Sequence, residues 1–291
     1  MAKEMKEMLQ EYGPGQISRR EFIQKSAVVT GGIAVGAVLP DAIAPSASYA
    51  AQVDANDQAL ASTDVKFPAT DGASVGGYLS RPKGDGKFPG VVVIHENRGL
   101  NDHIRDVARR LAKAGYAAIA PDLLSRQGGT GSFASADDVG KGIAKLDEET
   151  LTKDLTSAIN YLKGQNFVRA NKIGVTGFCW GGGNVLLIAT RNKDVAASVV
   201  FYGRNPKNID DVQNIVGPVM GLYGGADERI TGGVPDLEAA MKKYGKSFEY
   251  KIYPGAPHAF HSDANPERYR ADAAKDAWGN TLEFFKKHLQ S

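Results

Sequence analysis

Short apolar runs that alternate with helical patterns constrain the fold of this chain more than any other feature. The runs are bounded by turn-forming residues and fall at residues 91–94, 117–120, 173–176, 197–201, 219–223 and 250–253. Short continuous apolar runs, several of them rich in β-branched residues, are typical of strands that are buried on both faces. A sheet covered on both sides is therefore expected.

Helical patterns lie between these runs. Apolar side chains between Leu151 and Leu162 recur at spacings of three and four residues, which indicates a helix with one buried stripe. Similar patterns occur at residues 107–111, 237–241 and 272–289. Strands that alternate with helices predict parallel βαβ units. The expected fold class is therefore α/β, with a mostly parallel central sheet and helices on both faces.

The remaining segments complete the predicted domain organisation. Residues 65–79 predict an antiparallel hairpin at one edge of the sheet, and Pro and Gly within residues 121–145 predict a long surface loop. We expect residues 65–291 to form a single domain, preceded by a flexible segment at residues 51–64.

The first fifty residues have the layout of a signal peptide. Arg19 and Arg20 precede an uncharged apolar stretch from Ala27 to Leu39, and a region of small residues ends at Ala50. Adjacent arginines before an apolar core are typical of the twin-arginine export signal. We expect a periplasmic or secreted protein, with no stable membrane insertion after the signal is cleaved. The alternative is an N-terminal arm on a cytoplasmic enzyme.

Composition limits the classes of partner and cofactor. The chain has 35 basic and 33 acidic residues, a balance that argues against a nucleic-acid partner. A single cysteine excludes an intrachain disulfide and is either an inert core residue or a reactive thiol. His258 and His261 could chelate a metal, but no third ligand accompanies them, so no metal and no cofactor are expected. We expect a monomer or small homo-oligomer that acts on a small molecule.

The cysteine lies in a motif with a strong structural meaning. The segment Gly177-Phe178-Cys179-Trp180-Gly181 follows a predicted strand directly and precedes residues compatible with a helix. This is the G-x-nucleophile-x-G elbow of α/β-hydrolases, with Cys in the place of the usual Ser. The two glycines remove Cβ atoms from a sharp turn, and the helix N-terminus favours a thiolate and a developing oxyanion. The alternative is a structural cysteine in a tight turn.

A histidine and an acid should follow the nucleophile in the order nucleophile, acid, histidine. Of the 5 histidines, His258 and His261 lie in the loop after the last predicted strand. His258 is the preferred base and His261 is the reserve. Asp227, just after the strand at residues 219–223, is the predicted acid, whereas its neighbour Glu228 is interpreted as a solvated loop charge. Asp227 would fix the tautomer of His258, which takes the thiol proton.

These motifs resemble those of the dienelactone hydrolase (carboxymethylenebutenolidase) family, over a stretch from about Val65 to Leu289. The matching segments are the cysteine elbow at 177–182, the acid segment at 225–227, the histidine segment at 255–260, the glutamate loop at 95–100 and the arginine segment at 121–126. The resemblance implies an α/β-hydrolase fold and hydrolysis of small esters or lactones.

The resemblance also implies roles for individual residues. Glu96 would contact the resting thiol and help to generate the thiolate. The backbone N–H groups of Asn97 and Trp180 would form the oxyanion hole. Arg126 would bind a substrate carboxylate, and Tyr202 would line the substrate site.

One position departs from the family pattern. Where the family's best-known members have a second arginine, four residues after the histidine, this chain has Ser262. Arg98 or Arg268 could compensate. A dienelactone is therefore a less secure prediction as the substrate than a general ester or lactone.

The sequence thus predicts a hydrolase of small esters or lactones that works through a Cys179-His258-Asp227 triad and a thioacyl-enzyme intermediate. The alternative is a ligand-binding protein on a hydrolase scaffold with little or no turnover, because a fold alone does not fix function. The presence of nucleophile, acid and histidine in the expected order favours the hydrolase.

Overall fold

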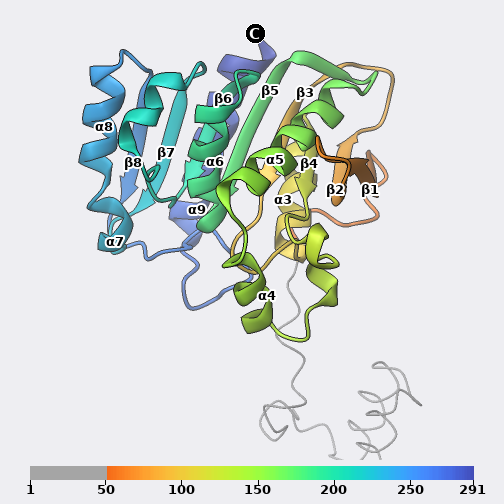
Figure 1. The fold of residues 1–291 in the computed structure, drawn as a ribbon, viewed down its shortest axis with the longest axis horizontal. Coiled ribbons are helices and arrows are strands. Elements are labelled where there is room, and N and C mark those ends of the chain that lie inside the picture. Colours follow the sequence, from red (N-terminus) through yellow and green to blue (C-terminus); the bar gives the residue numbers. More distant parts are fainter. Residues whose placement is uncertain (1–50) are drawn as a thin grey trace, which may run out of the picture. The chain divides into compact units, whose positions relative to one another are not determined.

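A single sheet of eight strands, in the order β1-β2-β4-β3-β5-β6-β7-β8, organises the computed structural model, which describes residues 51–291 (Figure 1). The predicted signal peptide lies outside the described residues. In chain order the strands are β1 (Leu60–Pro68), β2 (Ser74–Pro82), β3 (Phe88–Ile94), β4 (Ala117–Pro121), β5 (Val168–Phe178), β6 (Val195–Phe201), β7 (Val219–Gly224) and β8 (Phe248–Tyr253). Strands β3 to β8 are parallel, while β2 runs antiparallel to both β1 and β4. The predicted α/β class and mostly parallel sheet are confirmed.

Helices cover both faces of this sheet. In chain order they are α3 (Asp102–Lys113), α4 (Ala136–Ile143), α5 (Glu148–Lys163), α6 (Trp180–Arg191), α7 (Glu228–Thr231), α8 (Val234–Lys243) and α9 (Ala271–Phe285). Short helical turns are η2 (Ser125–Gln127), η3 (Thr130–Ser132), η4 (Ile209–Asn214) and η5 (Lys286–Gln290). Among residues 51–291, no helix is both long and apolar enough to span a membrane.

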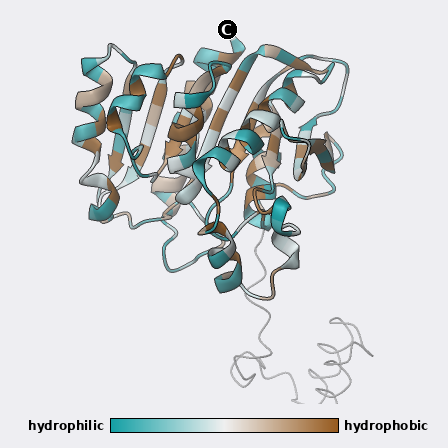
Figure 2. Ribbon diagram, viewed as in Figure 1, coloured by the Kyte–Doolittle hydropathy of each residue, from teal (hydrophilic) through white to brown (hydrophobic). Residues whose placement is uncertain are grey.

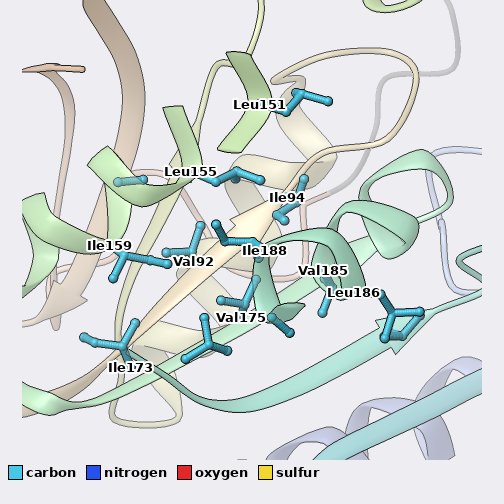
Figure 3. Packing of buried hydrophobic residues seen from close by; sticks show 14 of the residues in the cluster. Val92, Ile94, Leu151, Leu155, Ile159, Ile173, Val175, Val185, Leu186 and Ile188 are labelled. Carbon is cyan, nitrogen blue, oxygen red and sulfur yellow. The ribbon is translucent and has the colours of Figure 1, made fainter. Parts of the chain in front are cut away.

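The core is divided into two layers by the sheet. On one face, α5, α6 and α8 pack against the strands, and their buried stripes include Leu155, Ile159 and Ile188, which lie near Val92 and Val175 (Figure 3). On the other face, α3 and α9 form a second buried cluster. Hydrophobic residues accordingly concentrate on the strands and on the helix sides that face them (Figure 2). The three- and four-residue spacing in the sequence thus identifies the buried face of α5 correctly.

Capping residues fix where several helices begin. The side chain of Asn101 accepts a hydrogen bond from the N–H of Ile104 at the start of α3, and Asp147 accepts one from Thr150 at the start of α5. Such caps satisfy backbone donors that have no partner within the helix. The cap at Asn101 begins α3 directly after the loop that carries Glu96.

Two segments differ from the sequence prediction. The edge hairpin is present, but β1 begins at Leu60 rather than Val65, and its first residues pair with β2, which ends at Pro82. The polar residues within β1 conceal its apolar signal. The predicted surface loop at residues 121–145 also contains α4, whose two internal glycines weaken the helical pattern of its sequence.

The order of the strands predicts that a ligand site lies at one end of the sheet. Strand β3 lies between β4 and β5, so the chain leaves β3 in one direction to form β4 and later returns to its other side. In open parallel sheets, ligands bind at the carboxyl ends of the strands beside such a switch point. Here those strand ends lead into His95 and Glu96 after β3, and into Cys179 after β5.

Candidate active site

Cys179 occupies a strained turn between β5 and α6. Its backbone has φ 57° and ψ −117°, a conformation that is rare for a residue with a side chain. A Cβ at Gly177 would lie 2.5 Å from the carbonyl oxygen of Gly181, and a Cβ at Gly181 would lie 2.5 Å from that of Ile94. Only glycine at both positions lets the chain turn this tightly, as the elbow motif predicts.

The thiol of Cys179 meets His258 and Asp227 from two other strand ends. Its Sγ lies 2.9 Å from Nε2 of His258, whose Nδ1 bonds to a carboxylate oxygen of Asp227. The acid loop and the histidine loop are joined by backbone bonds: the N–H of Gly225 donates to Tyr253 at 2.8 Å, and a further bond joins residue 226 to residue 256 at 2.9 Å. The structure thus brings the three predicted residues together in a rigid arrangement.

The partners of His258 determine where its proton lies. A carboxylate only accepts hydrogen bonds, so Nδ1 must donate to Asp227 and Nε2 is left to accept from the thiol. Burial raises the pKa of Cys179 to about 11; Glu96 adds to this effect, while the N–H of Trp180 opposes it. Cys179 therefore rests as a neutral thiol near neutral pH. The N-terminus of α6 favours the thiolate, but burial of Cys179 disfavours the thiolate more strongly.

Glu96 and Tyr202 form a second buried group beside the thiol. Burial raises the pKa of the Glu96 carboxyl, and burial also raises the pKa of the Tyr202 phenol. The phenol is close enough to lower the pKa of Glu96. Yet, among the described residues, neither Oε1 of Glu96 nor the hydroxyl of Tyr202 has a hydrogen-bond partner of normal geometry. The ring of Tyr202 lies edge-on to His258 with centroids 5.1 Å apart. Two unsatisfied polar atoms beside a nucleophile are suited to contact a polar substrate.

The implied contact between Glu96 and the resting thiol does not occur as a hydrogen bond. The hydrogen bond that Cys179 forms through Sγ goes to His258, and Glu96 acts on the thiol only through its charge. The carboxylate would oppose, rather than favour, loss of the thiol proton. Of the two predicted oxyanion donors, Trp180 is the first residue of α6, and the exposed Asn97 follows Glu96 in the loop after β3.

Comparison with known proteins agrees with this geometry. Residues 75–289 match the model of the dienelactone hydrolase family. The chain belongs to this family. A relative from Methylorubrum extorquens, named "Putative carboxymethylenebutenolidase", is 36% identical over an alignment of 284 residues, and the alignment covers 94% of this chain and 96% of that protein. A protein of the same name from Saccharolobus solfataricus is 37% identical and covers 76% of this chain and 97% of its own length.

A solved structure supports the same conclusion. The "Putative Dienelactone Hydrolase" from Klebsiella pneumoniae has a TM-score of 0.73 and 31% identity to this chain, with 79% of this chain and 100% of that one covered. This dienelactone hydrolase family member is therefore a hydrolase of ester or lactone bonds, and its α/β-hydrolase fold is confirmed.

Arg126 is held by two carboxylates. Its guanidinium donates to Asp154 at 2.8 and 3.1 Å and to Asp71 at 2.9 Å, and Asp154 is almost fully buried in α5. These ion pairs give Arg126 a structural role, and its implied role as a substrate clamp stays a prediction.

The remaining candidate residues differ in burial and in their contacts with the site. His261 is buried and stacks on Phe178 with ring centroids 5.2 Å apart, and burial lowers its pKa well below the usual value. It is a core residue and not a second base. Ser262 is also buried, whereas Arg268 is exposed. Arg98 is exposed and close enough to Glu96 to lower the pKa of that carboxyl. Of the two suggested replacements, Arg98 is therefore the one whose charge acts on Glu96.

Two further findings concern metal binding and the environment of His95. Within residues 51–291, no cluster of three or more His, Cys, Asp or Glu side chains is arranged to hold a metal ion. His95, which precedes the nucleophile in the chain and so does not fit the expected order of the triad, is buried beside the elbow, where its ring stacks on Trp180 with centroids 5.4 Å apart. Only its place directly before Glu96 hinted at a role.

Proposed function

We propose that this chain hydrolyses small esters and lactones through a thioacyl-enzyme formed on Cys179. One observation carries the proposal: Sγ lies 2.9 Å from Nε2 of His258, whose other nitrogen is held by Asp227. A nucleophile, a base and a residue that orients the base are thereby within reach of one another.

Acylation begins with transfer of the thiol proton to Nε2 of His258. The sulfur electron pair then attacks the substrate carbonyl carbon, forming an S–C bond and a tetrahedral oxyanion. Asp227 stabilises the imidazolium without taking its proton. As the C–O bond of the ester breaks, the leaving oxygen takes the proton from His258. In a lactone, that oxygen stays attached to the acyl chain.

Deacylation repeats the cycle with water. His258 takes a proton from the water as its oxygen attacks the thioester carbonyl. The C–S bond then breaks, the free acid leaves, and the proton returns to sulfur. In both halves, we propose that the N–H groups of Asn97 and Trp180 stabilise the oxyanion, each contributing about 3 kcal/mol to the lowering of the barrier.

The substrate class follows from the charges around the thiol. Arg126 is already paired with Asp71 and Asp154, and Ser262 stands where an arginine would complete a clamp. The exposed Arg98 acts on Glu96, and the exposed Arg229 acts on the thiol. We therefore propose that the enzyme accepts small esters and lactones that carry no carboxylate, and that any carboxylate contact is made by Arg98 or Arg229.

Hydrolysis of p-nitrophenyl acetate and of a simple dienelactone by the wild type, by Cys179→Ala and by iodoacetamide-treated protein tests the mechanism. Because the chain has 1 cysteine, alkylation by iodoacetamide can be followed at Cys179 alone by the mass of the protein. We expect both treatments to reduce turnover by roughly four to six orders of magnitude. Turnover that survives in Cys179→Ala would contradict the proposal, as would a wild type inactive on every ester and lactone tested.

We further propose that the enzyme is exported, because Arg19 and Arg20 precede the apolar stretch at residues 27–39. Replacing both arginines with lysine should retain the protein inside the cell. Sequencing the N-terminus of periplasmic protein should give a start near Ala51, and a start at Met1 would contradict cleavage of the signal.

A further inference from the structure

His95 follows β3 directly and has both ring nitrogens engaged by the backbone. Its Nδ1 lies 2.7 Å from the carbonyl oxygen of Glu96, and its Nε2 lies 3.3 Å from the N–H of Leu123. A carbonyl only accepts and an N–H only donates, so the ring must be neutral with its proton on Nδ1. The side chain is fully buried, and burial lowers its pKa, which keeps it in this form.

The bond to Glu96 has a consequence for the next residue. The carbonyl of Glu96 and the N–H of Asn97 belong to the same planar peptide unit and point in opposite directions. A hydrogen bond that holds the oxygen therefore also fixes the direction of the N–H. That N–H is one of the two proposed oxyanion donors, and Asn97 itself lies in an exposed turn.

His95 also contacts the residue that supplies the other donor. Its ring stacks on Trp180, with centroids 5.4 Å apart and planes inclined by 20°. Trp180 is the first residue of α6, and its N–H points toward the thiol closely enough to lower the pKa of Cys179. Gly181 brings the elbow against the end of β3, because any Cβ there would overlap the carbonyls of Ile94 and His95.

We propose that His95 is a positioning residue that sets both halves of the oxyanion hole: it orients the 96–97 peptide through Nδ1 and holds Trp180 by stacking. The proposal rests on the proposed function, since it concerns the stabilisation of an oxyanion formed by attack of Cys179. The hydrogen bonds and the ring contact of His95 go to Glu96, Leu123 and Trp180 and not to the thiol. Its bond to Leu123 anchors the ring to the segment that follows β4.

Two substitutions divide the hydrogen bonds of His95 between them. In His95→Asn, the side-chain amide replaces Nδ1 and can still donate to Glu96, but the N–H of Leu123 loses its acceptor. In His95→Gln, the longer side chain reaches the Nε2 position and can accept from Leu123, but the carbonyl of Glu96 loses its side-chain donor and keeps the backbone N–H of Gly99, which lies 3.2 Å away. Both variants lose the stacked ring, so the comparison isolates the bond that orients the peptide.

The measurements are kcat and KM for p-nitrophenyl acetate, the rate of alkylation by iodoacetamide, and Tm. Alkylation needs the thiol and His258 but no oxyanion hole, so we expect both variants to alkylate within about twofold of the wild type. We expect kcat of His95→Gln to fall about 10²-fold, the effect of losing one oxyanion donor, with KM nearly unchanged. His95→Asn should keep at least about ten times the kcat of His95→Gln.

Three results would overturn the proposal. Equal losses of kcat in the two variants, or losses that follow Tm rather than the identity of the retained bond, would indicate a purely structural role. A parallel fall in alkylation would place the effect in the triad. Wild-type turnover that survives in Cys179→Ala would remove the proposed function and this inference together, whereas loss there combined with equal variants would remove only the inference.

Discussion

Nε2 of His258 lies 2.9 Å from Sγ of Cys179, although the two residues are 79 positions apart in the chain. The distance is set by strand ends rather than by local sequence, because Cys179 follows β5 and His258 lies in the loop after β8. Both loops are held by backbone bonds and by close approaches at glycine. The pair is therefore organised before a substrate arrives, as efficient acyl transfer requires.

Replacing Asp227 with Asn should preserve the fold and reduce kcat about 10⁴-fold, because an amide can hold His258 in the wrong tautomer and cannot stabilise the imidazolium. Steady-state kinetics with p-nitrophenyl acetate would measure the loss. The adjacent Glu228→Gln, at an exposed position, is the matched control and should retain wild-type kcat. Similar effects of the two substitutions would contradict the assignment of the acid.

The pH dependence of thiol alkylation should reveal the charge of Glu96. Burial and Glu96 together raise the pKa of Cys179 to about 11, so the wild-type rate with iodoacetamide should still be rising between about pH 8 and pH 10. In Glu96→Gln a negative charge near the thiolate is removed, which lowers the pKa of the thiol. The rate at about pH 9 should then increase by up to about tenfold, the effect of one pKa unit. An unchanged or slower rate would show that Glu96 does not oppose ionisation.

Removal of the Arg126 side chain should affect stability more than substrate choice. Arg126→Leu leaves the buried carboxylate of Asp154 without its cation, and we expect unfolding free energy to fall by about 3 kcal/mol. The exposed Arg191, which pairs with Asp211, is the control, and Arg191→Leu should cost less than about 1 kcal/mol. Denaturant unfolding measures both.

The same Arg126 variant tests the substrate proposal. The ratio of kcat/KM for a neutral aryl ester to that for its carboxylate-bearing analogue should match the wild type in Arg126→Leu. A selective loss of activity on the charged ester would restore the clamp role that the family resemblance implies.

A structural feature of this chain can be predicted from the sequence when residues adjacent in the chain specify it. The strands and the elbow at Cys179 could be predicted because a few adjacent residues specify them. The role of Arg126 could not, because Asp71 and Asp154 lie far from it in sequence and meet it only in the fold. Helix α4 was hidden by Gly140 and Gly142.

The environment of His95 depends on contacts with Leu123 and Trp180, which no spacing rule reveals. Histidine beside a glutamate in a loop has many explanations in a sequence. Only the structure shows that both of its nitrogens are occupied by backbone groups, which excludes it as a base and gives it a role in orientation.

Two glycine substitutions should have opposite effects on stability. A methyl group at Gly181 would meet backbone carbonyl oxygens of Ile94 and His95, which cannot rotate away, so Gly181→Ala should cost at least about 3 kcal/mol and abolish esterase activity. At Gly140, inside α4, a methyl group meets nothing within 4 Å, and Gly140→Ala should stabilise the protein by about 0.5–1 kcal/mol with kcat unchanged. Thermal unfolding and p-nitrophenyl acetate turnover measure both effects. A Gly181→Ala variant with wild-type Tm and kcat would show that the elbow tolerates a side chain, and the close approach of α6 to the end of β3 would then be wrong.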